Sequence, residues 1–235
     1  MLPNEQKSLA AIHYIKTHQK ELIARFVGST QPVSKPISIF MAGSPGAGKT
    51  EFSTHLIGEI LGADDTIVRI DPDEIRIWLP QYEAGKAELM QGAVATAVNK
   101  LHDYVKSKSY SFLLDGTFSK YEQAITNVQQ SLDKRRPILI QYVIQPPEVA
   151  WQFTQDRERV DGRNILREDF IAQFIAARDT VATIKKKFGK KLQVDLIERN
   201  LRTKSYDIEF NIDNLDRYLP KKYSIDDIEK LIWLT

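Results

Sequence analysis

The sequence predicts an α/β fold, in which helices cover both faces of a mainly parallel sheet. Short apolar segments alternate with segments of helical periodicity along most of the chain, as they do in such folds. A glycine-rich segment, GSPGAGKT, stands between the first apolar segment and the helical segment that follows it. The apolar segment SFLL ends in a carboxylate, Asp115, and a buried carboxylate is costly unless a positive charge meets it.

The individual elements follow from apolar periodicity and from the residues that interrupt it. Gly28, Pro32 and Pro36 break the pattern after an N-terminal amphipathic helix, and Gly62 is a natural C-cap for a later helix. Ser224 is expected to cap the last helix. Helices are expected over residues 4–26, 50–62, 71–79, 87–107, 121–135, 147–159, 167–189 and 224–234. Strands are expected over residues 37–43, 66–70, 111–117, 137–145, 192–199 and 206–211.

Bulk composition excludes several classes of function. The formal net charge of +2 is too small to indicate a nucleic-acid or membrane-surface protein. The chain has no cysteine, which excludes disulfides, thiolate zinc sites and thiol nucleophiles. The N-terminal segment lacks a long apolar run, and no stretch reaches the length of a membrane span. We therefore expect a cytoplasmic protein without a membrane partner.

The glycine-rich segment matches the Walker A pattern, G-x-x-x-x-G-K-[ST], in the strand-to-helix context that this pattern requires. Its glycines let backbone N–H groups surround phosphate oxygens, and the following helix adds its positive N-terminus. Lys49 is expected to reach the β- and γ-phosphates, and the Thr50 hydroxyl to bind Mg²⁺. A nucleoside triphosphate, ATP by class, is therefore expected to bind the eight residues of this loop: Gly43, Ser44, Pro45, Gly46, Ala47, Gly48, Lys49 and Thr50.

Phosphate binding by this loop also suggests why the apolar segment SFLL ends in the carboxylate of Asp115. In P-loop folds a central strand beside the P-loop strand ends in a carboxylate that faces the metal and the phosphates. Asp115 is therefore a candidate ligand for the metal or the substrate, and Thr117 is a candidate substrate-binding residue beside it. The alternative is that Asp115 only caps the helix after Gly116.

Among P-loop proteins, the sequence favours a small kinase. The Asn-Lys-x-Asp motif that reads guanine in GTPases is absent, and Asp115 is followed by glycine rather than by the second acid of AAA-type ATPases. We expect an N-terminal helix and linker over residues 1–36 and a kinase domain over residues 37–235, with a core at 37–200 and an extension at 201–235.

Kinase chemistry needs a base near the acceptor hydroxyl and arginines that cover the transferred phosphoryl group. Asp71 and Asp73 follow the second predicted strand; Asp73 is the favoured base, while Asp71 is also a candidate N-cap. The segment TQDRERVDGRNILRE carries Arg157, Arg159, Arg163 and Arg167 across a helix break that is expected at Gly162. The alternative interpretation is that this arginine-bearing segment is a solvated turn with local ion pairs.

These motifs together resemble the zeta toxins. FMAGSPGAGKTEF, IDPDEIR, LLDGTF and the Arg-x5-Arg of RERVDGR follow the order and spacing of that family over roughly residues 35–200. The resemblance implies a P-loop kinase that phosphorylates the 3′-hydroxyl of UDP-activated amino sugars, chiefly UDP-N-acetylglucosamine. It also implies toxin–antitoxin biology, with a small helical antitoxin that blocks the nucleotide site as the candidate protein partner.

Carried over by position, the resemblance assigns roles to single residues. Lys49 and Thr50 match the nucleotide and Mg²⁺ groups, and Asp73 matches the base. Arg157 and Arg163 best match the two phosphate-clamping arginines, although Arg159 or Arg167 could replace one of them because the family often spaces the pair more widely. Asp115 stands where the family usually has Glu, so the departure concerns the acceptor more than the chemistry.

Two alternatives stay open at this point. One is a P-loop kinase of another acceptor, such as a nucleotide or a polynucleotide end. The basic segments IKKKFGKK and RNLRTK favour a polynucleotide acceptor. Aromatic residues do not interleave with the basic ones, however, which argues against nucleic-acid binding. The other is an interaction protein gated by nucleotide that transfers no phosphate.

Overall fold

A computed structural model describes residues 3–60, 66–161, 164–200, 203 and 205–233. It contains one six-stranded sheet in the order β2-β3-β1-β4-β5-β6, in which every neighbouring pair is parallel except β5 and β6. The predicted α/β fold is confirmed. The strands are β1 (Ser38–Ala42), β2 (Ile67–Ile70), β3 (Ser111–Leu114), β4 (Ile138–Ile144), β5 (Gln193–Arg199) and β6 (Tyr206–Glu209).

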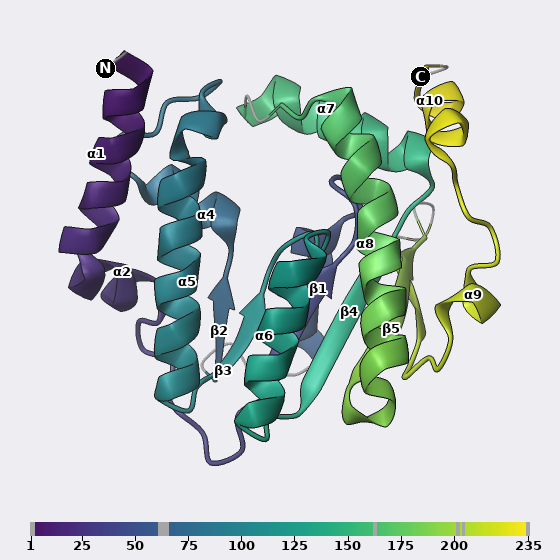
Figure 1. The fold of residues 1–235 in the computed structure, drawn as a ribbon, viewed down its shortest axis with the longest axis horizontal. Coiled ribbons are helices and arrows are strands. Elements are labelled where there is room, and N and C mark those ends of the chain that lie inside the picture. Colours follow the sequence, from purple (N-terminus) through teal and green to yellow (C-terminus); the bar gives the residue numbers. More distant parts are fainter. Residues whose placement is uncertain (1–2, 61–65, 162–163, 201–202, 204, 234–235) are drawn as a thin grey trace.

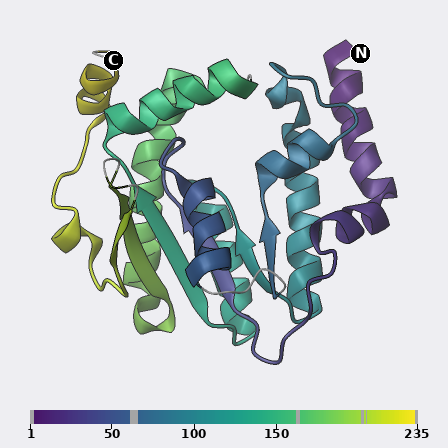
Figure 2. The ribbon, with the colours of Figure 1, turned by 180° about the vertical axis from the view of Figure 1, so that it is seen from behind.

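Helices cover the two faces of the sheet unequally (Figures 1 and 2). The short α3 (Lys49–His55) and the π-helical turn after it (Leu56–Ile60) cover one face. The other face carries α5 (Gln91–Ser107), α6 (Tyr121–Asp133) and α8 (Arg167–Phe188). The remaining helices are α1 (Pro3–Thr17), α2 (Gln19–Phe26), α4 (Pro72–Trp78), α7 (Pro147–Asp161), α9 (Leu215–Tyr218), α10 (Ile225–Trp233) and the 3₁₀ turns Ala87–Met90 and Gly189–Lys191.

The two-residue period of the strands explains how one short apolar strand serves both faces. In β1, Phe40 and Ala42 pack into the large core beneath α5, α6 and α8. Ile39 and Met41 point the other way, into the smaller core beneath α3. All four side chains are almost completely buried, as expected for a central strand of a parallel sheet.

The N-terminal segment differs from its prediction as one continuous helix over residues 4–26. Two helices form instead, because His18 leaves helical geometry (φ −108°, ψ 33°) and its Nδ1 lies 3.0 Å from the carbonyl oxygen of Tyr14. The bend brings fully buried side chains from both pieces, Ala11 and Ile15 in α1 and Leu22 in α2, into the large core. Both helices pack against α5 (Figure 1).

Helix α7 crosses the carboxyl ends of the strands (Figure 1) and rests on a core of its own. Ala150 and Trp151 of α7 pack there with Phe170 of α8 and with Ile228 and Ile232 of α10. The predicted cap of α10 is present: the Ser224 hydroxyl accepts a hydrogen bond from the Asp227 N–H at 3.1 Å. No helix in the described part of the chain is both long and apolar enough to cross a membrane.

Candidate active site

The loop between β1 and α3 has the backbone of a phosphate cradle. Gly43, Gly46 and Gly48 have φ values of +139°, +73° and +87°, which L side chains rarely adopt. A Cβ at Gly43 would overlap the carbonyl oxygen of Val143, so the loop lies directly against β4. The Lys49 ammonium donates to the carbonyl oxygens of Gly43 (3.1 Å) and Ser44 (2.7 Å), which holds it against the loop.

Gly46 provides a direct test of how closely α7 approaches the cradle. A Cβ at Gly46 would overlap the carbonyl oxygen of Ala150 in α7, whereas Gly85 has a similar φ of +79° with nothing within 4 Å of its Cβ position. Gly85→Ala should therefore report the backbone strain alone, about 1–2 kcal/mol in the free energy of unfolding. Gly46→Ala should cost about 2 kcal/mol more, measured by urea unfolding, and should weaken nucleotide binding. Equal losses in the two variants would contradict this packing.

Burial changes the pKa of Lys49, the charged side chain of the cradle. Burial lowers the pKa of its ammonium to about 8, against the attraction of Asp115 and Asp73, while Arg157 acts in the same direction as burial. A bound phosphate would restore the higher pKa, because an anion favours the charged form.

Nucleotide binding should therefore take up a proton in mildly alkaline solution. At pH 8.5 we expect uptake of most of one proton per Mg-ADP bound, and less near pH 7, because Lys49 is then already protonated. Calorimetry in buffers of different ionisation enthalpy measures this. The control is Lys49→Arg, whose guanidinium stays charged and should show no uptake of this kind. Uptake by both proteins would assign the proton to another group.

The positive charge that meets Asp115 comes from Arg69, in the neighbouring strand β2. One guanidinium nitrogen, Nη2, donates to Asp115 Oδ2 at 2.9 Å and to Asp71 Oδ2 at 2.7 Å, and Nη1 donates to Glu74 at 2.7 Å. The buried Ser53 hydroxyl of α3 also donates to Asp115 Oδ2, at 3.1 Å. Sequence reasoning missed Arg69, although an arginine inside the apolar segment TIVRI was the available signal.

The two aspartates after β2 occupy different environments. Asp71 is buried and is the N-cap of α4: its Oδ1 accepts the Asp73 N–H at 2.8 Å. Burial and the nearby Asp115 raise the pKa of Asp71 to about 6, although Arg69 acts in the opposite direction. The Asp73 side chain is 34% exposed, against 8% for Asp71, so Asp73 is the more accessible carboxylate.

Two arginines bind the two carboxylate oxygens of Asp73. Arg76, one turn further along α4, donates to Asp73 Oδ1. Arg157, from α7, lies 3.3 Å from Asp73 Oδ2 and so joins α7 to α4. The candidate base and one candidate clamp are thus brought together although they lie 84 residues apart in the sequence.

The other candidate arginines have different surroundings. Arg159 is 73% exposed and pairs with Asp156 on its own helix. The Arg167 guanidinium lies 4.1 Å from the ring centroid of Trp233 and 5.9 Å from that of Trp151, a packing role between α8, α10 and α7. Arg163 lies outside the described residues, as do Gly62 and Gly162.

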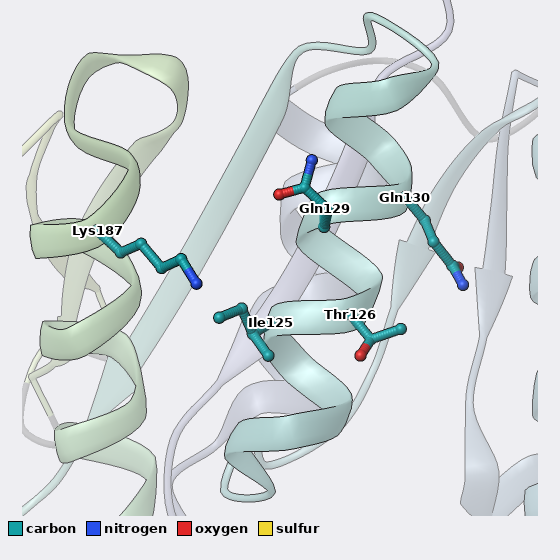
Figure 3. Close-up of a pocket in the computed structure, with 5 residues that line it drawn as sticks. All are labelled: Ile125, Thr126, Gln129, Gln130 and Lys187. Atoms are coloured by element: carbon teal, nitrogen blue, oxygen red, sulfur yellow. The ribbon is translucent and has the colours of Figure 1, made fainter.

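Thr117 lies beside the cradle through its backbone. Its carbonyl oxygen accepts the Gly43 N–H at 3.1 Å, and its hydroxyl lies 2.8 Å from that of Ser119. A hollow on the protein surface lies away from this region, between α6 and α8 (Figure 3). None of the candidate site residues lines it; Lys187 of α8 points across it toward Ile125 of α6.

A Walker A cradle beside strand-end carboxylates, with an arginine-bearing helix above, defines a P-loop phosphotransferase. The family model of the zeta toxins matches residues 22–211. The chain therefore belongs to the zeta toxin family, as the sequence motifs predicted.

Solved structures agree on the fold. The protein is similar to a structure from the PezAT chromosomal toxin–antitoxin system of Streptococcus pneumoniae, with 17% sequence identity, a TM-score of 0.69 and coverage of 94% of this chain and 93% of that one. It is also similar to a chain of the AvrRxo1-ORF1:-ORF2 crystal structure with ATP, with 13% identity, a TM-score of 0.62 and coverage of 87% and 71%. A comparison with curated proteins gave no match.

Proposed function

We propose that this protein transfers the γ-phosphate of ATP to a hydroxyl of a sugar nucleotide such as UDP-N-acetylglucosamine. The observation that carries the proposal is that three side chains interact electrostatically beside the carboxyl ends of the strands: Lys49 of the cradle, Asp73 in the first turn of α4, and Arg157 of α7. Family membership supports the sugar-nucleotide acceptor, which is the acceptor class that the resemblance to zeta toxins implies.

In the proposed mechanism, the residues of the chain position the reactants and stabilise charge. Asp73 accepts the proton of the acceptor hydroxyl as that oxygen attacks the γ-phosphorus and the bond to ADP breaks. Lys49 and Arg157 balance the negative charge on the transferred phosphoryl group. Arg163 is the proposed second clamp, Thr117 is a proposed acceptor-binding residue, and Asp115 is a proposed ligand of the acceptor or of the metal.

Mg²⁺ is part of this proposal. The oxygen donors at the site, the Thr50 hydroxyl and the Asp115 carboxylate, are the ligand type that Mg²⁺ prefers, and Mg²⁺ commonly adds phosphate oxygens and waters to one or two protein ligands. In the described ranges no group of three or more His, Asp or Glu could hold a metal ion by itself. When bound, Mg²⁺ would neutralise charge on the β- and γ-phosphates.

The proposed protein partner is an antitoxin-like inhibitor of the nucleotide site. The support comes from the family and from the PezAT structure, whose title describes a toxin–antitoxin system.

The test is a product assay. Purified protein is incubated with Mg-ATP and UDP-N-acetylglucosamine, and mass spectrometry follows the sugar nucleotide. A mass increase of one phosphate supports the proposal. Tight ATP binding without a phosphorylated product would overturn the sugar-nucleotide acceptor, and other acceptors, including polynucleotide 5′-ends, would then be assayed in the same way.

A further inference from the structure

Arg199 ends β5 at the same edge of the sheet as the phosphate cradle. Its Cδ and Nη1 atoms lie 3.8 Å from the point where a Cβ on Gly48 would stand. The exposed Glu51 carboxylate lies at the same distance from that point. The side chain of Arg199 therefore lies beside the cradle, although its sequence context, RNLRTK, reads as a basic surface cluster.

The guanidinium of Arg199 has unused donors. Its Nε is buried and has no hydrogen-bond partner, and within the described ranges no carboxylate forms an ion pair with this residue. Arg69 and Arg178 also have a buried Nε without a partner, but each of them binds a carboxylate through Nη2 at 2.7 Å. A half-buried guanidinium with unused donors is unfavourable until an anion binds it, and the neighbouring loop is built to bind one.

The sheet order shows which part of a nucleotide Arg199 can reach. Asp115 and Asp73 follow β3 and β2, on one side of β1, whereas Arg199 belongs to β5, two strands away on the other side. Arg199 therefore lies on the side of the cradle away from the candidate base. Within the cradle, backbone N–H groups hold the α- and β-phosphates, while Lys49 reaches toward the γ-phosphate.

We propose that Arg199 is a further nucleotide-binding residue, whose guanidinium donates to the α-phosphate of a bound nucleoside di- or triphosphate. The inference rests on the proposed function for the identity of the nucleotide, but not on the acceptor. The proposed role of Arg199 is in binding and not in catalysis, because the α-phosphate does not take part in the transfer. The contact would strengthen nucleotide binding.

The experiment measures the Kd of Mg-ATP and of Mg-ADP by calorimetry for wild type, Arg199→Ala and Arg199→Lys. Arg199→Ala should raise both Kd values by about tenfold and by the same factor, the size expected for one charge-assisted hydrogen bond. Arg199→Lys should recover part of the loss, because an ammonium keeps the charge without the planar fork. The matched control is Arg25→Ala, an exposed arginine of α2, which should leave both Kd values unchanged.

Two results with a folded Arg199→Ala protein would overturn the inference. Kd values within twofold of wild type in a folded Arg199→Ala protein would remove Arg199 from the site. A loss for ATP much larger than for ADP would place the contact at the γ-phosphate instead. If Arg199→Ala unfolds, Arg199→Lys decides the question. Wild-type Kd values for Arg199→Lys would mean that the guanidinium does not bind the nucleotide and that Arg199 has a structural role. Absence of sugar-nucleotide phosphorylation in wild type would overturn the proposed acceptor and leave this binding result standing.

Discussion

Replacing Asp73 with asparagine is expected to slow phosphoryl transfer by about 10²–10⁴-fold, while ATP still binds. The amide has nearly the same shape as the carboxylate but cannot accept the proton of the acceptor hydroxyl. Rates of product formation at saturating ATP, together with the Kd of ATP, measure the two effects separately. The predicted loss is therefore in kcat, with only a small change in nucleotide affinity.

Asp71→Asn is the matched comparison, two residues away. Asparagine is as good an N-cap as aspartate, so the α4 cap that Asp71 provides should survive this change. We expect a much smaller loss of transfer rate than for Asp73→Asn. The opposite ranking would make Asp71 the base, and its raised pKa of about 6 would then be a catalytic property rather than a consequence of burial beside Asp115.

The Asp73→Asn variant also distinguishes a kinase from an interaction protein that is gated by nucleotide. Both readings require Lys49, so Lys49→Ala should abolish activity in cells under either one. Only the kinase reading requires the Asp73 carboxylate. Full cellular activity of Asp73→Asn would show that phosphoryl transfer is not what the protein does there.

Local sequence patterns were sufficient for the cradle and for most elements. The Walker A pattern and the two-residue alternation of Ile39, Phe40, Met41 and Ala42 depend on neighbouring residues only, so both are readable from the sequence. The bend at His18 was not readable, because apolar residues continue at helical spacing through it and tertiary packing on α5 decides the geometry.

The parts of the site that the sequence did not reveal depend on strand order. Arg69 meets Asp115 because β2 and β3 are neighbours, with Arg69 opposite Leu113 in the register. Arg199 lies beside Gly48 because β5 ends at the same edge as the cradle. Neither neighbourhood can be derived from spacing along the chain. The sequence marks Arg69 only as an arginine inside an apolar segment and Arg199 only as part of a basic cluster, and neither feature names a partner.

Replacing Arg69 with methionine is expected to have the largest effect on stability. The side chains of Asp71 and Asp115 are only 8% and 5% exposed, and Arg69 is the cation that binds both. Removing one partner of a buried ion pair typically costs about 3–5 kcal/mol, because the remaining charge stays buried without compensation. Urea unfolding measures this cost. Arg69→Lys keeps a cation and should recover part of it.

The pH dependence of unfolding shows whether the loss comes from these carboxylates or only from packing. In Arg69→Met the attraction that lowers the pKa of Asp71 is gone, so its native pKa should rise above the present value of about 6, while the unfolded value stays near 3.8. The native state then keeps a proton that the unfolded chain releases, so the free energy of unfolding falls as the pH rises from about 4 through the native pKa. The variant should therefore come closest to wild-type stability in acid, and Asp71→Asn added to it should flatten the profile. A deficit that is the same at every pH between 4 and 8 would mean that Arg69 stabilises the fold by packing rather than as the counter-charge of the two aspartates.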